Sequence, residues 1–240
     1  LTDVNSFLKT DPEVTLKSME IADALVCLHD LIGNALPKHL RKKLHVIKQS
    51  ASPLPGPRKP TTRHFDVCVV GHLREEKDPM RAALAARLVP ERSRLRVIHL
   101  GKAHNQAFAK AAQKEMATNP RYIWKGEVPA WRVRREYART QAMVITSNQE
   151  GGANVVSEAI AAGVPVIASD IDGNIGLLGK DYAGFYPVQD EAALADVLWR
   201  AENEAKFLKE LTRQTKKLRP LFLAKHEAKG WVDVVETVCR

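Results

Sequence analysis

Cysteine is scarce in this 240-residue chain. The three cysteines, Cys27, Cys68 and Cys239, are odd in number and far apart, which excludes a disulfide-stapled scaffold and a cysteine zinc site. Such usage is typical of a reducing compartment, so a cytoplasmic location is expected. The histidines show no metal-ligand spacing with one another or with carboxylates, and no metal site is expected.

Long apolar runs are also absent. No stretch approaches the roughly 20 residues that cross a bilayer, so no transmembrane segment is expected. The chain begins without the basic-then-apolar pattern of a secretion signal. It has no Gly-x-Ser-x-Gly elbow for a covalent nucleophile. Gly71 is followed by His72-Leu73, so the dinucleotide fingerprint of nicotinamide enzymes is missing.

Acidic residues are fewer than basic ones, 28 against 37, which gives a net charge of +9. No acidic residue lies between Asp30 and Asp66, and a second basic stretch spans residues 206–229. An excess of this size suits nucleic acid, an anionic membrane face or a phosphate-rich substrate. No nucleic-acid module signature is present, so nucleic acid binding is not expected, and solvated surfaces explain most of the basic runs.

A proline-rich segment divides the chain. Residues 53–60 carry four prolines in eight positions, which no helix or central strand can accommodate. We expect residues 1–52 to be the end of an α/β domain whose front half lies outside this chain, with short strands near 24–28 and 45–48. We expect a linker at 53–62, a Rossmann-like domain at 63–205 and C-terminal helices at 206–240. These helices are expected to close back toward the first part of the chain. Their expected apolar face consists of Trp231, Val232, Val234, Val235 and Val238.

Short apolar runs alternate with helical ones after the linker. Several of the runs are apolar on both faces, as in parallel strands covered by helices on both sides. The pattern predicts an α/β fold, a doubly wound parallel Rossmann-like sheet. The expected strands are 65–70, 95–100, 122–124, 142–146, 164–168 and 184–186.

The loop after strand 142–146 contains the most residues that could bind a ligand. Open parallel sheets bind ligands at the carboxyl ends of their strands. Gly151 and Gly152 allow a ligand close to the backbone, and Asn154 is predicted to cap a helix whose first amides face the same crevice, a ready phosphate site. Glu150 precedes this helix and Glu158 lies one turn inside it, where both carboxylates can accept hydrogen bonds from sugar hydroxyls.

Residues 147–169 resemble the donor-site signature of glycosyltransferase family 4 and its GT-B relatives, and the likeness in element order extends over 63–205. The resemblance implies a GT-B fold. It also implies that Glu150 contacts the donor sugar and Glu158 the nucleotide ribose. The diphosphate would meet the backbone of Gly151, Gly152, Ala153, Asn154 and Val155.

Two further loops take roles from the same resemblance. The family usually has Gly-Arg-Leu after the first strand and a lysine five residues beyond the arginine, and both cations neutralise the diphosphate. Lys77 matches the lysine, whereas His72 stands in the arginine position. Arg74 is an alternative for that cation, because a guanidinium suits phosphate oxygens. Val128, in the turn after strand 122–124, is implied as the contact to the uracil base.

Three loops, 72–79, 151–158 and 172–179, resemble the selenosugar synthases of selenoneine biosynthesis, and residues 23–51 fit them too. This resemblance implies a UDP-sugar donor, UDP-N-acetylglucosamine or UDP-glucose, and selenophosphate as the selenium source. A C–Se bond would form at the anomeric carbon as UDP leaves. No metal cofactor is implied, and the acceptor site and catalytic base are expected on the missing part of the N-terminal domain.

Two other functions remain open. One is an ordinary family 4 hexosyltransferase that acts on a hydroxyl of a lipid or glycan. The other is a nucleotide-sugar-binding module without turnover. All three share small-molecule partners and the same donor site.

Overall fold

The computed structural model describes residues 4–239, and its main feature is a six-stranded parallel sheet. The strand order is β5-β4-β3-β6-β7-β8. This confirms the predicted doubly wound sheet, with strand ends one or two residues from expectation at most. The strands are β3 Phe65–Val70, β4 Leu95–Leu100, β5 Tyr122–Trp124, β6 Ala142–Ile145, β7 Val166–Ser169 and β8 Phe185–Tyr186.

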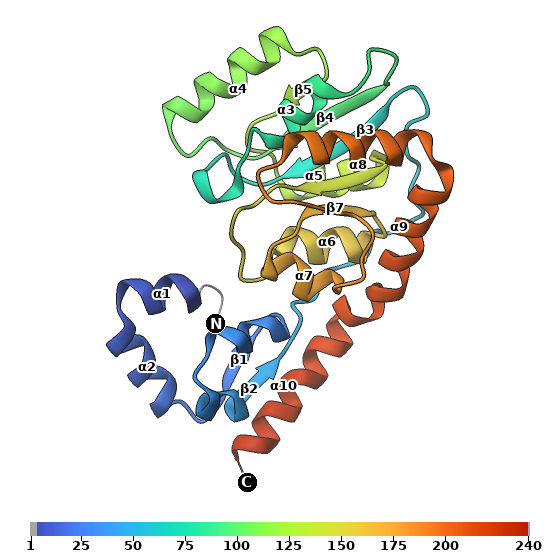
Figure 1. Cartoon of the computed structure of the whole chain (residues 1–240). Helices are drawn as coiled ribbons and strands as arrows, with labels where there is room; N and C mark the ends of the chain where they lie inside the picture. The colour runs from blue at the N-terminus through green and yellow to red at the C-terminus, as the bar shows by residue number, and fades with distance from the viewer. Residues whose placement is uncertain (1–3, 240) are drawn as a thin grey trace.

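Helices cover both faces of this sheet (Figure 1). The chain moves outward from β3 to β5 and then from β6 to β8 in the opposite direction, so right-handed crossovers place the two sets of helices on opposite faces. On one face α3 (Arg81–Leu88) packs against α8 (Glu191–Asn203), with α4 (Gln106–Thr118) beside them. On the other, α6 (Asn154–Ala162) contacts both α5 (Ala130–Arg139) and α7 (Asp172–Leu178).

The N-terminal residues form a second, smaller unit. Strands β1 (Leu25–Cys27) and β2 (Leu44–Val46) pair in parallel and share no strand with the large sheet. Helices α1 (Val4–Thr10) and α2 (Pro12–Ile21) cover them, and two 3-10 helices, η1 (Asp30–Ala35) and η2 (Lys38–Lys43), connect β1 to β2. The unit has its own apolar core, built from Val4, Met19, Leu25, Cys27, Ile32, Leu36 and Leu40.

A partly buried arginine helps to attach the linker to the large domain. The Arg58 guanidinium donates to the carbonyl oxygens of Gly163 at 2.7 Å and Tyr137 at 3.2 Å, and also to Thr140. These carbonyls lie at the carboxyl ends of α5 and α6, where backbone acceptors lack helical partners. Burial lowers the pKa of Arg58 to about 10. The linker is thereby tied to the two helices that flank the loop of Glu150.

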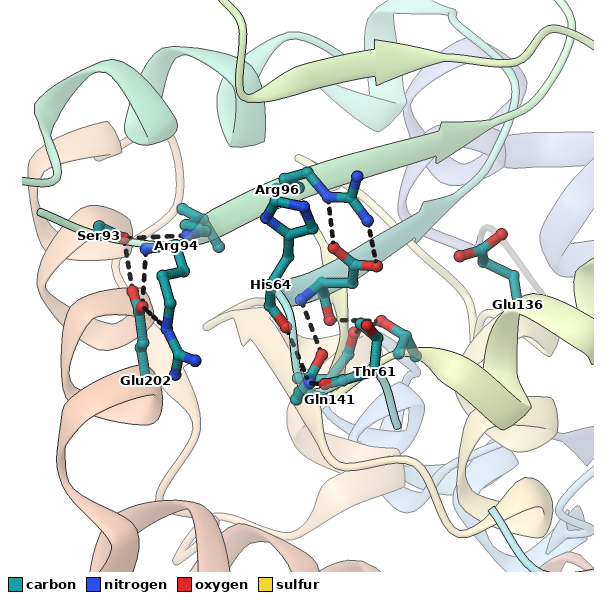
Figure 2. A network of polar contacts seen from close by, with 12 residues as sticks. Thr61, His64, Ser93, Arg94, Arg96, Glu136, Gln141 and Glu202 are labelled. Atoms are coloured by element: carbon teal, nitrogen blue, oxygen red, sulfur yellow. Dashed lines mark hydrogen bonds and ion pairs between the residues drawn. The ribbon is translucent and has the colours of Figure 1, made fainter. Parts of the chain in front are cut away.

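Side chains join the amino ends of the strands (Figure 2). Arg96 donates two hydrogen bonds to the Asp66 carboxylate, each 2.8 Å. Gln141 accepts from the Asp66 amide at 2.7 Å and donates to the carbonyls of Thr61 and His64. This network ties β3, β4 and the linker together, so the opposite edge is the one whose loops are left for a ligand.

The C-terminal helices run from the large sheet back to the small one. Helix α9 (Ala205–Leu218) and η4 (Arg219–Phe222) precede α10 (Ala224–Val238), which passes beside β2 in Figure 1. The Glu227 carboxylate accepts from the Ser50 amide at 2.9 Å. Gly230 lies so near Ile47 that a Cβ there would be 3.2 Å from its Cγ1. Of the expected apolar face only Val234 is buried, and the exposed members are Trp231, Val232, Val235 and Val238.

The structure also bears on membrane crossing and on the state of the cysteines. Within residues 4–239, none of the helices combines the length and apolarity that crossing a membrane requires. The cysteines carry free thiols, buried at Cys27 and Cys68 and exposed at Cys239.

Candidate functional site

A cleft lies at the carboxyl edge of the large sheet. Its first part is a cavity of about 570 Å³ bounded by the loops after β3, β4, β5 and β6. A second cavity of about 390 Å³ continues along α5 and α6. The two share a wall, so they form one elongated cleft past the start of α6. The shared residues are Gln49, Val70, Val133, Asn154 and Val155.

The site residues expected from the sequence gather around this cleft. Glu158 lines the second cavity, and Gly151 lies on the wall of neither. Whether these residues bind a donor as assigned stays a prediction. Those that line the first cavity are His72, Arg74, Lys77, Val128, Glu150, Gly152, Ala153, Asn154 and Val155.

Lys77 and Glu150 form an ion pair at one end of the cleft. Their side chains are only 19% and 10% exposed. The Ser147 hydroxyl donates to the same carboxylate oxygen at 2.6 Å. The Thr146 hydroxyl donates to the Lys77 carbonyl at 2.8 Å, which holds the backbone of the lysine against β6. Glu150 is therefore held in place by a cation and a hydroxyl before any ligand arrives.

The loop around Glu150 is wedged between two other segments. A Cβ on Gly173 in α7 would lie 2.1 Å from the Glu150 carbonyl oxygen, so only glycine permits this approach. On the other side, a Cβ on Gly152 would lie 2.6 Å from the Cβ of Leu28 in the N-terminal unit. The position of Glu150 thus depends on contacts from both units of the chain.

The start of α6 differs from the sequence expectation. Ala153, not Asn154, is the N-cap residue, and no side chain caps the helix. Ala153 is extended, and its carbonyl already accepts from the Val156 amide at 2.9 Å, so the helix begins one residue earlier than predicted. Asn154 is then the first helical residue and its side chain is exposed. The Asn154 and Val155 amides remain first-turn donors without a helical acceptor.

Glu158 lies in a different environment from Glu150. The buried Tyr137 hydroxyl donates to its carboxylate at 3.4 Å. Partial burial of the carboxyl group raises the pKa of Glu158, and the Tyr137 hydrogen bond and the Arg134 charge oppose that shift. Arg134 itself donates to the Ser52 carbonyl at 2.9 Å, which ties α5 to the start of the linker.

Both candidates for the second cation line the cleft. The Lys102 amide donates to Nδ1 of His72 at 3.1 Å, which leaves Nε2 as the protonated nitrogen of the neutral ring. Arg74 pairs with Glu76 at 2.7 Å, and its side chain is 43% exposed. The contacts of His72 and of Arg74 leave both side chains able to contact a phosphate.

A buried histidine fixes the loop that carries His72. His99 Nε2 lies 3.1 Å from the Gly71 carbonyl oxygen, and Nδ1 lies 3.0 Å from the Tyr122 hydroxyl. Burial lowers the pKa of His99 to about 4, so the ring is neutral near pH 7. Because a carbonyl only accepts, Nε2 carries the hydrogen and Tyr122 donates to Nδ1. Sequence reasoning gave His99 no role.

Several other residues in or beside the cleft received no individual role from the sequence. Ser147 directly follows the predicted strand 142–146, so its position could have suggested a site role. Tyr137 lies in the middle of a helix, and Gln49 and Leu28 belong to the other sheet, so no local pattern marks them. In the part of the chain that the structure describes, no three His, Cys, Asp or Glu side chains are grouped to hold a metal ion.

Comparison with solved structures defines the class of fold. Anabaena HepE, solved with UDP and glucose, superposes with a TM-score of 0.82 at 15% identity, over 97% of this chain and 68% of HepE. The pneumococcal O-GlcNAc transferase GtfA, solved with UDP and GlcNAc, gives 0.75 at 18% identity, over 95% of this chain and 47% of GtfA. The fold is that of GT-B glycosyltransferases.

The family follows from the sequence comparison. Residues 57–218 match the model of the family Glycosyl transferases group 1, and the chain belongs to this enzyme family. A curated relative, TuaC of Bacillus subtilis (strain 168), is 35% identical over 91 residues. Its name describes a putative glycosyltransferase of teichuronic acid biosynthesis. That match covers 38% of this chain and 23% of TuaC, so the chain spans only a part of its curated relative.

Proposed function

We propose that this chain carries the donor site of a UDP-sugar-dependent glycosyltransferase. The observation that carries the proposal is one cleft that holds Lys77, the first turn of α6 and the carboxylates of Glu150 and Glu158. Membership of the glycosyl transferase family supports it. The nucleotide is proposed as UDP because HepE and GtfA were both solved with UDP.

The order of groups along the cleft suggests how the donor lies. Lys77 and the free amides of α6 would bind the diphosphate, since a helix start and a cation both favour an anion. Either His72 or Arg74 would supply the second contact. Glu150 would accept from sugar hydroxyls and Glu158 from the ribose, while the backbone at Val128 would meet the base.

Catalysis in this cleft would come from charge stabilisation. UDP gains negative charge as its bond to the anomeric carbon breaks, and donors already in place stabilise that charge without reorganising. We propose that Lys77 and its neighbours do this without a metal ion. If so, UDP affinity should be unchanged by EDTA. No residue of this chain is proposed as the catalytic base.

We further propose a selenosugar synthase, within glycosyltransferase family 4. The support is the likeness of loops 72–79, 151–158 and 172–179, together with the contact of Gly173 on the Glu150 loop, which puts the third of these loops beside Glu150. Selenium of selenophosphate would bond to the anomeric carbon of N-acetylglucosamine, and UDP would leave with the electron pair of the broken C–O bond. The free thiols support a cytoplasmic location.

Calorimetric titration with UDP, UDP-N-acetylglucosamine and UDP-glucose tests the donor site, with ADP as the control nucleotide. UDP binding is expected, and its absence would refute the proposal. Turnover by the full-length protein then separates the finer alternatives. UDP release that requires selenophosphate supports the selenosugar reaction, release with a hydroxyl acceptor supports ordinary hexosyl transfer, and binding without release under either condition indicates a non-catalytic module.

A further inference from the structure

Among the described residues of the N-terminal unit, Gln49 alone lines both cavities of the cleft. It follows β2 and is partly buried. Asn154 and Val155, the first residues of α6, line the same two cavities. A side chain from the small sheet therefore meets the cleft where the helix start offers its amides.

The backbone on either side of Gln49 is tightly held. The Ile47 amide donates to the Cys27 carbonyl at 2.9 Å, which extends the pairing of β1 with β2. The Ser50 amide donates to Glu227 of α10 at 2.9 Å. The Ala51 amide donates to the Phe222 carbonyl at 3.0 Å. Gln49 thus projects from a segment whose position both the small sheet and the C-terminal helices determine.

The next side chain is anchored as well. The Lys48 ammonium donates to the Gly176 carbonyl of α7 at 2.9 Å, so the same segment also contacts the large sheet's helices. In contrast, the Gln49 carboxamide makes no hydrogen bond with any residue between 4 and 239. An amide group offers two donors and one acceptor, and partial burial without partners costs free energy. A rigid backbone with a free polar end is the arrangement expected of a ligand-binding residue.

The surroundings favour an anionic group as the partner. The α6 start carries a partial positive charge, and the Lys77 ammonium, which is paired with Glu150, lines the first cavity. An amide N–H beside such groups adds a further donor to an anion.

We propose that Gln49 donates a hydrogen bond to the diphosphate of the bound UDP-sugar. This inference rests on the proposed function and adds a donor contact from outside the large sheet. The diphosphate would then be held between the α6 amides on one side and the Gln49 amide on the other. Since Gln49 is fixed by both units, donor binding would also depend on their relative position.

Three proteins and one ligand test the inference. UDP affinity is measured by calorimetry for the wild type, Gln49→Ala and Gln49→Glu. Loss of one hydrogen bond to a charged group should weaken UDP binding roughly tenfold or more in Gln49→Ala. Gln49→Glu should weaken it further, because it replaces a donor with a negative charge that repels the diphosphate.

The matched control is Gln113→Glu, which makes the same change of charge on the exposed surface of α4, a helix that lines neither cavity. Its UDP affinity should equal that of the wild type, and thermal unfolding checks that each variant is folded. UDP affinities of both Gln49 variants within twofold of the wild type would overturn the inference. Tighter binding by Gln49→Glu than by Gln49→Ala would also overturn it, since the side chain would then act as an acceptor for the ribose. Failure of the wild type itself to bind UDP would refute the proposed function.

Discussion

The two carboxylates of the cleft have different partners. Glu150 is paired with a cation and a hydroxyl, whereas Glu158 accepts from the Tyr137 phenol and is close enough to Arg134 to feel its charge. Identical side chains eight residues apart therefore have different electrostatic environments. This difference is compatible with the two roles that we propose, Glu150 for sugar hydroxyls and Glu158 for the ribose.

A division of labour between them is the first prediction. Glu158→Ala should weaken UDP and UDP-sugar alike, because the ribose belongs to both ligands. Glu150→Ala should weaken UDP-sugar and leave UDP nearly unaffected. Each lost hydrogen bond to a charged group corresponds to roughly a ten- to hundredfold loss of affinity, which calorimetry resolves.

Lys77→Ala is the companion variant. It should weaken both ligands and reduce the salt dependence of binding, because its contact is with the diphosphate charge. Equal losses of UDP affinity in Glu150→Ala and Glu158→Ala would contradict the division. An unaltered salt dependence in Lys77→Ala would remove the lysine from the diphosphate contact.

The second prediction concerns pH. Partial burial raises the pKa of Glu158 above its ordinary value of 4.5. Protonation removes the charged acceptor, so UDP affinity should fall as the pH drops through this raised pKa, and the fall should begin at a higher pH than for a fully solvated glutamate. Affinities measured between pH 8 and pH 5 for the wild type and Glu158→Gln isolate this effect, because both share the titration of UDP itself. Parallel pH profiles in the two proteins would exclude a binding role for the Glu158 charge.

At the scale of the elements, the orientation of α5 and α6 depends on their carboxyl ends. Arg58 satisfies carbonyls at both ends, while the other end of α6 forms a wall of the cleft. A single side chain of the linker therefore contacts the carboxyl end of the helix whose first residues line the cleft.

Arg58→Met is the third prediction. Methionine keeps an apolar stem but leaves buried carbonyls without donors, which should lower the free energy of unfolding by about 2 kcal/mol. Urea unfolding at pH 7 provides the measurement. Lys59→Met is the control, because Lys59 is exposed and substitutions at such positions stay within about 0.5 kcal/mol. A loss in Lys59→Met as large as that in Arg58→Met would mean that the guanidinium contacts contribute nothing specific.

At the scale of the molecule, the two units have separate apolar cores, and they meet through polar contacts and through close packing of Leu28 on Gly152 and Ile47 on Gly230. Lys48 reaches Gly176 in α7, and Glu227 in α10 holds the Ser50 amide. Hydrogen bonds from Ser50 lower the pKa of Glu227, so its carboxylate stays charged under ordinary conditions. These contacts hold the segment of Gln49 against the cleft.

The fourth prediction follows from these contacts. Glu227→Ala should speed amide hydrogen exchange in residues 44–51 and in α10, and leave β3, β4 and β6 unaffected, because only the contact between the units is lost. Glu236→Ala, an exposed position on the same helix, is the matched control and should exchange like the wild type. If exchange rose equally throughout the large sheet, Glu227 would contribute to global stability and not to this junction.

The strands of the large sheet could be predicted from the sequence because their apolar patterns are local. Strand β3 was predicted with the same ends that it has in the structure, since a short apolar run between a linker and a loop leaves little choice. The start of α6 was placed one residue late, at a cap that Asn154 does not make. The choice between Ala153 and Asn154 depends on backbone geometry that neighbouring loops impose, and residue preferences alone do not resolve it.

The sequence by itself determined the alternation of strands and helices after the proline-rich segment and the residue types of the loop from Glu150 to Glu158. Each of these is a property of adjacent residues. Only the tertiary structure decided that Lys77 pairs with Glu150, and that Gln49 and Tyr137 reach the same cleft. The physical reason is that these contacts join residues far apart in the chain, so they exist only after the elements have packed and oriented their side chains toward a common space.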